Sequence, residues 1–84
     1  MYYVYVLKSL KNGRYYTGST CDIERRLLEH MTGKSKATKH LRPFRLVFAE
    51  EFDTRTDAYK RERYLKTGKG REDREVLIAK HMGA

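Results

Sequence analysis

The chain has 84 residues, a length that accommodates one folded domain. It carries 19 Lys and Arg against 11 Asp and Glu, which gives a formal net charge of +8 at pH 7. The positive charge is spread along the chain, so we expect a folded basic domain and not a disordered basic tail. Such a surface favours nucleic acid as the partner over acidic protein or anionic lipid.

Cysteine content and N-terminal hydropathy exclude several other classes. Cys21 is the only cysteine, so no intramolecular disulfide can form, and no spacing of histidines and carboxylates predicts a structural zinc site. The apolar run at the N-terminus is too short for a signal peptide or a membrane span. We therefore expect a cytoplasmic protein with no membrane partner.

The N-terminal residues predict a β-hairpin. Residues 2–9 are β-branched and aromatic, and residues 14–19 form the return strand after Asn12-Gly13. This dipeptide favours a two-residue type I′ turn, in which both central residues have positive φ. This two-residue loop places Tyr3, Tyr5 and Leu7 on the same sheet face as Tyr16 and Gly18, whereas a loop of odd length would move Tyr16 to the other face.

A helix is predicted from Asp22 to about Met31, with Thr20 or Asp22 as its N-cap and Gly33 at its end. Its apolar stripe has helical spacing and consists of Ile23, Leu27, Leu28 and Met31. Arg26 and His30 are four residues apart, so they lie together along one edge of this stripe.

Residues 33–43 are polar and basic, which predicts a long loop. Its candidate phosphate contacts are Lys34, Lys36, Lys39, His40 and Arg42. Residues 44–52 then predict a third strand, in which Leu46, Phe48 and Glu50 alternate against Val47, Ala49 and Glu51.

Two helices complete the chain. The first is capped by Thr54 or Thr56 and runs to about Thr67, with Gly68 at its C-terminal end; the second spans about Asp73 to His81. Between them lies a second basic cluster made of Lys66, Lys69 and Arg71. The element order β-β-α-β-α-α predicts an α+β fold, a small three-stranded antiparallel sheet flanked by helices.

Glu62 is the least expected residue of its helix. It lies between Ala58 and Leu65 on the inward stripe, where an apolar side chain would pack better. A buried carboxylate is costly unless it is paired or binds a metal. The alternative is an exposed Glu62 that pairs with Lys66 at i, i+4, and spacing alone favours this alternative.

These features together resemble the GIY-YIG endonuclease family, and in particular its short stand-alone bacterial branch. The resemblance covers nearly the whole chain and rests on Tyr3-Val4-Tyr5, Tyr16-Thr17-Gly18, Arg26, His30 and Glu62. Tyr3, Val4 and Thr17 depart from the Gly, Ile and Ile of the family motifs, which we interpret as variation in strand packing. The resemblance implies a single GIY-YIG nuclease-like domain over residues 1–84. This domain would hydrolyse DNA phosphodiester bonds with one divalent ion, Mg²⁺ or Mn²⁺.

The resemblance also implies roles for individual side chains. Glu62 would be the one protein ligand of the metal, Tyr5 the general base and Tyr16 its assistant. Arg26 would neutralise charge on the phosphate, and His30 would hold either the tyrosine or the phosphate. Two other classes stay open: a non-catalytic DNA- or RNA-binding module that keeps the fold, and a protein-interaction module.

Overall fold

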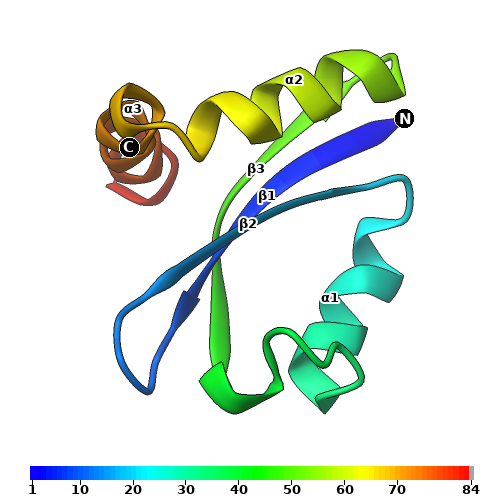
Figure 1. Ribbon diagram of the computed structural model, residues 1–84, viewed down its shortest axis with the longest axis vertical. Coiled ribbons are helices and arrows are strands. Elements are labelled where there is room, and N and C mark those ends of the chain that lie inside the picture. Colours follow the sequence, from blue (N-terminus) through cyan, green and yellow to red (C-terminus); the bar gives the residue numbers. More distant parts are fainter. Residues whose placement is uncertain (84) are drawn as a thin grey trace.

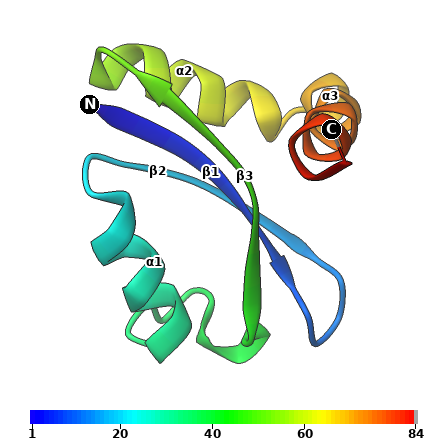
Figure 2. The same cartoon turned by 180° about the vertical axis from the view of Figure 1, so that it is seen from behind.

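A three-stranded antiparallel sheet separates one helix from two others (Figures 1 and 2). The computed structural model describes residues 1–83. Its elements are β1 (Tyr2–Ser9), β2 (Tyr15–Thr20), α1 (Ile23–Thr32), the 3₁₀ helix η1 (Lys39–Leu41), β3 (Phe44–Phe52), α2 (Arg55–Leu65) and α3 (Gly68–Gly83). The strand order β2-β1-β3 makes β2 an edge strand, with one side unpaired. The predicted α+β class and element order are confirmed.

The hairpin between β1 and β2 is longer than predicted. The Ser9 amide donates to the Arg14 carbonyl at 2.8 Å, which leaves a four-residue connection from Leu10 to Gly13. Gly13 has φ +77°, and Asn12 does not have positive φ. The predicted two-residue type I′ turn is therefore wrong.

Ser9 explains the longer turn. Its buried hydroxyl oxygen accepts from the amides of Lys11 and Asn12 at 3.2 and 3.3 Å, so these amides need no strand partner. Because the loop still has an even number of residues, the predicted faces hold. Tyr5 stands opposite Gly18 in the ladder, and Leu7 stands opposite Tyr16.

Each face of the sheet has its own core. Tyr5, Leu7 and Phe44 are buried on the α1 face. The face under α2 and α3 buries Val4, Val6, Val47, Phe48, Ala58 and Leu65. A register irregularity between Val6 and Leu7 interrupts the pairing with β3, so Val47 and Phe48 are both buried in the second core and Leu46 packs in the first. The strict alternation predicted for this strand is therefore wrong.

Helix α1 is capped as predicted but is rotated relative to its apolar stripe. The Asp22 carboxylate accepts from the Arg25 amide at 3.1 Å, and Gly33 ends the helix with φ +82°. Leu28 and Met31 are 63% and 39% exposed, so they do not belong to the buried stripe. The buried position is His30.

Helices α2 and α3 meet at a tighter junction than predicted. Thr54 caps α2, which ends at Leu65, and α3 begins at Gly68 and not at Asp73. The Thr67 hydroxyl accepts from the Gly70 amide at 3.0 Å and starts the new helix. A Cβ at residue 70 would lie 1.7 Å from the Tyr64 carbonyl oxygen, so the close approach requires glycine there. The first turn of α3 contains Gly68 and Gly70, so the sequence pattern did not predict that the helix begins there.

Within residues 1–83 no helix is long and apolar enough to cross a membrane.

Candidate active site

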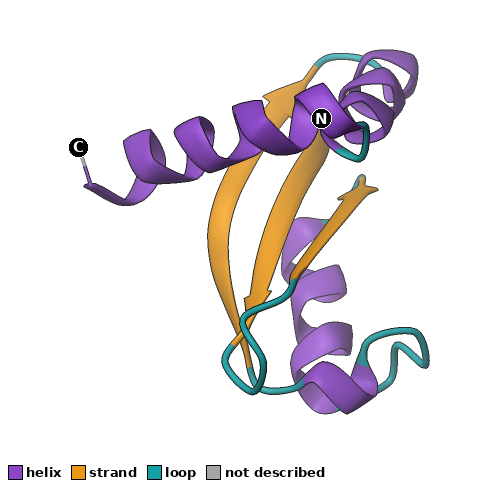
Figure 3. Cartoon of the chain, turned by 60° about the vertical axis from the view of Figure 1, so that its left-hand side comes forward, coloured by secondary structure: helices purple, strands orange, loops and turns teal. Residues whose placement is uncertain are grey.

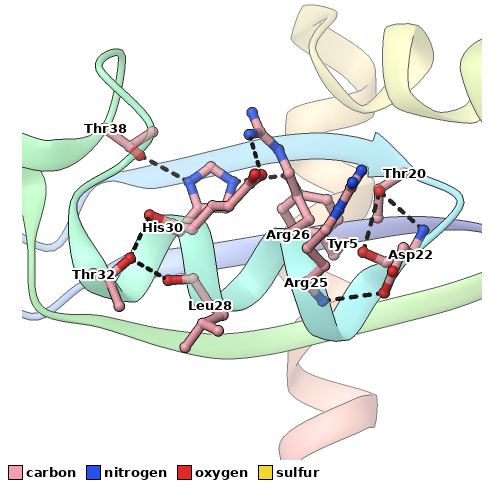
Figure 4. Close-up of polar contacts among 10 residues, drawn as sticks. Tyr5, Thr20, Asp22, Arg25, Arg26, Leu28, His30, Thr32 and Thr38 are labelled. Atoms are coloured by element: carbon pink, nitrogen blue, oxygen red, sulfur yellow. Dashed lines mark hydrogen bonds and ion pairs between the residues drawn. The ribbon is translucent and has the colours of Figure 1, made fainter.

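A chain of hydrogen bonds links Tyr5, His30 and Thr38 on the side of the sheet that α1 covers (Figure 4). The Tyr5 hydroxyl lies 2.9 Å from Nε2 of His30, and Nδ1 of the same ring lies 2.8 Å from the Thr38 hydroxyl. Tyr5 is 1% exposed, while His30 is completely buried. Both ring nitrogens of the histidine are thus committed to side-chain hydroxyls, which fixes the orientation of the ring.

Tyr16 and Arg26 stand beside this chain. The rings of Tyr16 and His30 have centroids 5.0 Å apart, and those of Tyr5 and Tyr16 are 6.4 Å apart. Arg26 donates through Nη1 to Glu29 Oε1 at 3.0 Å. This contact is the main reason that the pKa of Arg26 is raised, and the neighbouring Tyr5 and Tyr16 add to it. The structure therefore brings together four of the five predicted catalytic residues: Tyr5, Tyr16, Arg26 and His30.

Burial sets the protonation states of the central pair. It raises the pKa of Tyr5 to about 12, with Tyr16 adding to the rise; Arg26 opposes it, and the negative charge of Glu62 adds a smaller increase. Burial also lowers the pKa of His30, and Arg26 lowers it further. Near neutral pH the pair therefore consists of a protonated phenol and an uncharged imidazole.

Gly18 makes room for the Tyr5 phenol. A Cβ at this position would lie 2.6 Å from the Tyr5 oxygen and 2.8 Å from Cζ. Because Gly18 faces Tyr5 across the ladder, the phenol passes over β2 where that strand has no side chain. The hydroxyl is thereby directed toward the unpaired edge of the sheet.

Glu62 approaches the same edge strand from the opposite face. Its Oε1 accepts from the Ser19 hydroxyl of β2 at 2.5 Å. Ser19 is paired with Val4, whose side chain belongs to the core under α2, whereas its neighbour Gly18 lies under the Tyr5 phenol. The phenols and the carboxylate thus lie on opposite sides of the sheet, and β2 is the element that both reach.

The sequence leaves two interpretations of Glu62, an inward carboxylate or an exposed partner of Lys66, and the structure shows part of each. The side chain is only 16% exposed, as an inward position requires. It also pairs with Lys66, whose Nζ lies 2.7 Å from Oε2. The carboxylate is therefore neither a simple exposed partner of Lys66 nor a buried charge without a partner.

The surroundings of Glu62 fit a divalent cation held through one carboxylate. Ser19 fixes one oxygen, while the other is held by a lysine that is half exposed and can rotate away. In residues 1–83 no three His, Cys, Asp or Glu side chains gather as a metal site, so the remaining ligands would be water and phosphate oxygens. A pocket of about 230 Å³ lies beside Ser19; its lining residues, which do not include Glu62, are Tyr2, Ser19, Thr20, Cys21, Arg55 and Ala58.

The two predicted basic clusters take different positions. The first is anchored to the site, because Thr38 lies in the same loop and contacts His30. Its charged side chains are exposed: Lys36, Lys39, His40 and Arg42, with Lys34 at its start. In the second cluster Lys66 pairs with Glu62, whereas Lys69 and Arg71 are exposed in the first turns of α3 and not in a loop.

Sequence reasoning missed the residues that orient the predicted ones. Thr38 was counted only as part of a polar loop, yet it is 1% exposed and holds His30. Ser19 holds Glu62, and Glu29 holds Arg26. A hydroxyl or carboxylate that contacts a residue distant in sequence leaves no periodic signal, so only the Arg26–Glu29 pair, at i, i+3, had a detectable spacing.

The chain is similar to proteins of a known family. A family model described as the GIY-YIG catalytic domain matches residues 1–75. A UPF0213 protein of Staphylococcus saprophyticus is 46% identical over 67 residues, which span 79% of this chain and 80% of that protein. A UPF0213 protein of Natronomonas pharaonis is 40% identical over 98% of this chain and 95% of its own length. The solution NMR structure of a UPF0213 protein from Bacillus halodurans superimposes with a TM-score of 0.60 at 35% identity, covering 99% of this chain and 89% of that one.

Proposed function

Because the chain belongs to the GIY-YIG catalytic domain family, we propose that it is a metal-dependent endonuclease that hydrolyses DNA phosphodiester bonds. The observation that carries the proposal is the buried hydrogen-bond chain Tyr5–His30–Thr38, which ends in a phenol directed over Gly18 toward an unpaired edge strand. Binding alone needs a basic surface and gains nothing from an uncharged histidine held behind a tyrosine.

The Tyr5 hydroxyl would relay a proton from the attacking water. A phenol with pKa near 12 is a poor general base by itself, because little phenolate is present at neutral pH. His30 supplies the acceptor: with Nδ1–H donating to Thr38, its Nε2 accepts the phenol proton as Tyr5 takes one from water. Tyr16, close to both rings, would orient the water.

Arg26 would bind the phosphate that is attacked. Its guanidinium is part-buried, and Glu29 holds one of its nitrogens while others remain for a phosphate oxygen. In a site of reduced exposure, a cation already in place stabilises the charge that develops on the phosphate without reorganisation. Arg25, at the preceding position of α1, is exposed and would contribute only to the overall positive charge of the surface.

Glu62 would hold the metal, Mg²⁺ or Mn²⁺, on the α2 side of β2. The bound ion would polarise a phosphate oxygen and make water easier to deprotonate. Ser19 keeps the carboxylate directed at the strand, and Lys66 balances its charge until a cation binds. The scissile phosphate would therefore cross the edge of β2, between the phenols on one face and the carboxylate on the other.

A cleavage assay tests this proposal directly. Purified protein is incubated with labelled duplex, nicked, branched and single-stranded DNA, and with RNA, in the presence of Mg²⁺, Mn²⁺ or EDTA. We expect discrete cuts that require the metal. Glu62→Gln protein, purified in parallel, controls for contaminating nuclease and should leave the substrates intact. Binding to these substrates without any metal-dependent cut would support the non-catalytic module instead.

A further inference from the structure

Arg74 of α3 is a part-buried cation without an acidic partner among the described residues. Its guanidinium carbon lies 4.8 Å from the centroid of the Tyr15 ring, and Nη1 donates to the Thr17 hydroxyl at 3.5 Å. Burial lowers the pKa of Arg74 and neighbouring Arg71 lowers it further; adjacent Glu75 opposes this but forms no ion pair with Arg74 among the described residues.

The guanidinium is also incompletely hydrogen-bonded. Its Nε is the only buried side-chain nitrogen or oxygen in the described part of the chain that has no partner. The third guanidinium nitrogen, Nη2, also has no hydrogen-bond partner among the described residues. Unlike Nε it is not fully buried, so it is accessible to solvent. Holding a cation in this way reduces the stability of the fold. Such an arrangement is expected where an anion from outside completes the site.

Arg74 and the proposed metal ligand, Glu62, contact the same face of β2. Side chains alternate along β2, so Thr17 and Ser19 point to the same face, about 7 Å apart. Thr17 contacts Arg74, and Ser19 contacts Glu62. Figure 3 shows α3 running across the strands on the side away from α1. Arg74 and Glu62 are thus on one face of β2, while Arg26 lies on the other face.

We propose that Arg74 binds a backbone phosphate of the nucleic acid, adjacent to the phosphate that is cut. The inference rests on the proposed function and adds a second contact to it. The planar guanidinium matches phosphate geometry, and the Tyr15 ring fixes its orientation. Arg26 and Arg74 then hold the backbone from opposite faces of the edge strand.

The test measures how binding depends on salt. Fluorescence anisotropy with duplex DNA, from about 50 to 200 mM salt, uses the non-cleaving Glu62→Gln protein as parent. Adding Arg74→Gln should reduce the salt slope by about 0.9, so the affinity ratio between these two salt concentrations falls about 3.5-fold. Arg63→Gln is the matched control. Arg63 also lies over a tyrosine, 5.7 Å from the Tyr59 ring, but on an exposed position of α2.

Each outcome decides the inference. A reduced slope in Arg74→Gln alone, restored by Arg74→Lys, supports it, and the melting temperature of Arg74→Gln should be unchanged or higher. An unchanged slope in a parent that does bind DNA overturns the inference and leaves the proposed function standing. Equal effects of Arg63→Gln and Arg74→Gln, or an unfolded Arg74→Gln protein, also overturn it. A parent that binds no nucleic acid contradicts the proposed function itself.

Discussion

The Tyr5 hydroxyl is hydrogen-bonded to His30 Nε2 at 2.9 Å, although the two residues are 25 positions apart in the chain. One comes from the central strand and the other from the last turns of α1. Because the pKa of Tyr5 is raised and that of His30 is lowered, the shared proton lies on the phenol in the resting protein. This pair places a phenol proton beside a neutral imidazole nitrogen that can receive it.

The first prediction concerns stability at high pH. The pKa of Tyr5 is about 12 in the folded protein and near 10 when unfolded, so between these values the unfolded state binds fewer protons. The free energy of unfolding should therefore fall as pH rises from 10 to 12, with the contribution of Tyr5 fully present below pH 10. Melting curves of wild-type and Tyr5→Phe protein over this range should show the steeper loss in the wild type. Parallel curves would mean that Tyr5 ionises normally.

Thr38→Val should impair cleavage and stability together. The change keeps the shape of the side chain but leaves Nδ1 of buried His30 without its partner. An unsatisfied buried polar group costs about 1–3 kcal/mol of unfolding free energy, and the freed ring no longer presents Nε2 to Tyr5 in one orientation. Urea denaturation and single-turnover cleavage measure the two effects. Thr32→Val, in the exposed last turn of α1, is the control and should change neither by much.

Arg26 and Arg25 should differ sharply although they are adjacent. Arg26 is part-buried beside the tyrosines, whereas Arg25 is exposed. Loss of a preorganised transition-state contact typically lowers the rate by about a hundredfold to a thousandfold, so Arg26→Ala should reach that range and Arg25→Ala should have a small effect. Single-turnover rates at saturating DNA decide the matter. Equal losses would show that total charge matters and position does not.

Glu62 should separate cutting from binding. Glu62→Ala removes the proposed metal ligand and should abolish metal-dependent cleavage, while DNA affinity stays nearly unchanged because the phosphate contacts remain. Gel-based cleavage and anisotropy on the same preparation give both values. Lys66→Ala is the matched variant for the ion pair: it releases Oε2 and should retain cleavage. Wild-type cutting by Glu62→Ala would refute the metal-ligand assignment.

The basic loop should contribute to docking and not to chemistry. Lys36 and Lys39 are exposed on the loop whose Thr38 contacts His30, so the loop lies beside the site. Changing both lysines to Ala should lower the salt slope of binding by up to about two units and weaken all DNA sequences alike. The cleavage rate at saturating DNA should change little. An unaltered slope would place the DNA path away from this loop.

The sequence by itself determined the element order and the strand faces, and it predicted which residues of one helix or strand share a face. Alternation in β1 and β2 placed Tyr5, Tyr16 and Gly18 on one face even though the predicted turn was wrong, because a four-residue loop has the same parity as a two-residue loop. Helical spacing likewise placed Arg26 with His30, and Ala58 and Leu65 with Glu62. These are local periodicities, which depend only on backbone geometry.

The tertiary structure alone decided how these residues meet. No local pattern places Thr38 against His30, Ser19 against Glu62 or Arg74 against Thr17, since each contact joins elements whose relative positions follow from packing. The bulge in β3 and the early start of α3 were hidden for the same reason: burial on two faces and a tight helix junction override alternation and helix propensity. The position of Glu62 across an edge strand from the tyrosines is a property of the whole fold, because it requires the strand order β2-β1-β3 and helices on both faces of the sheet.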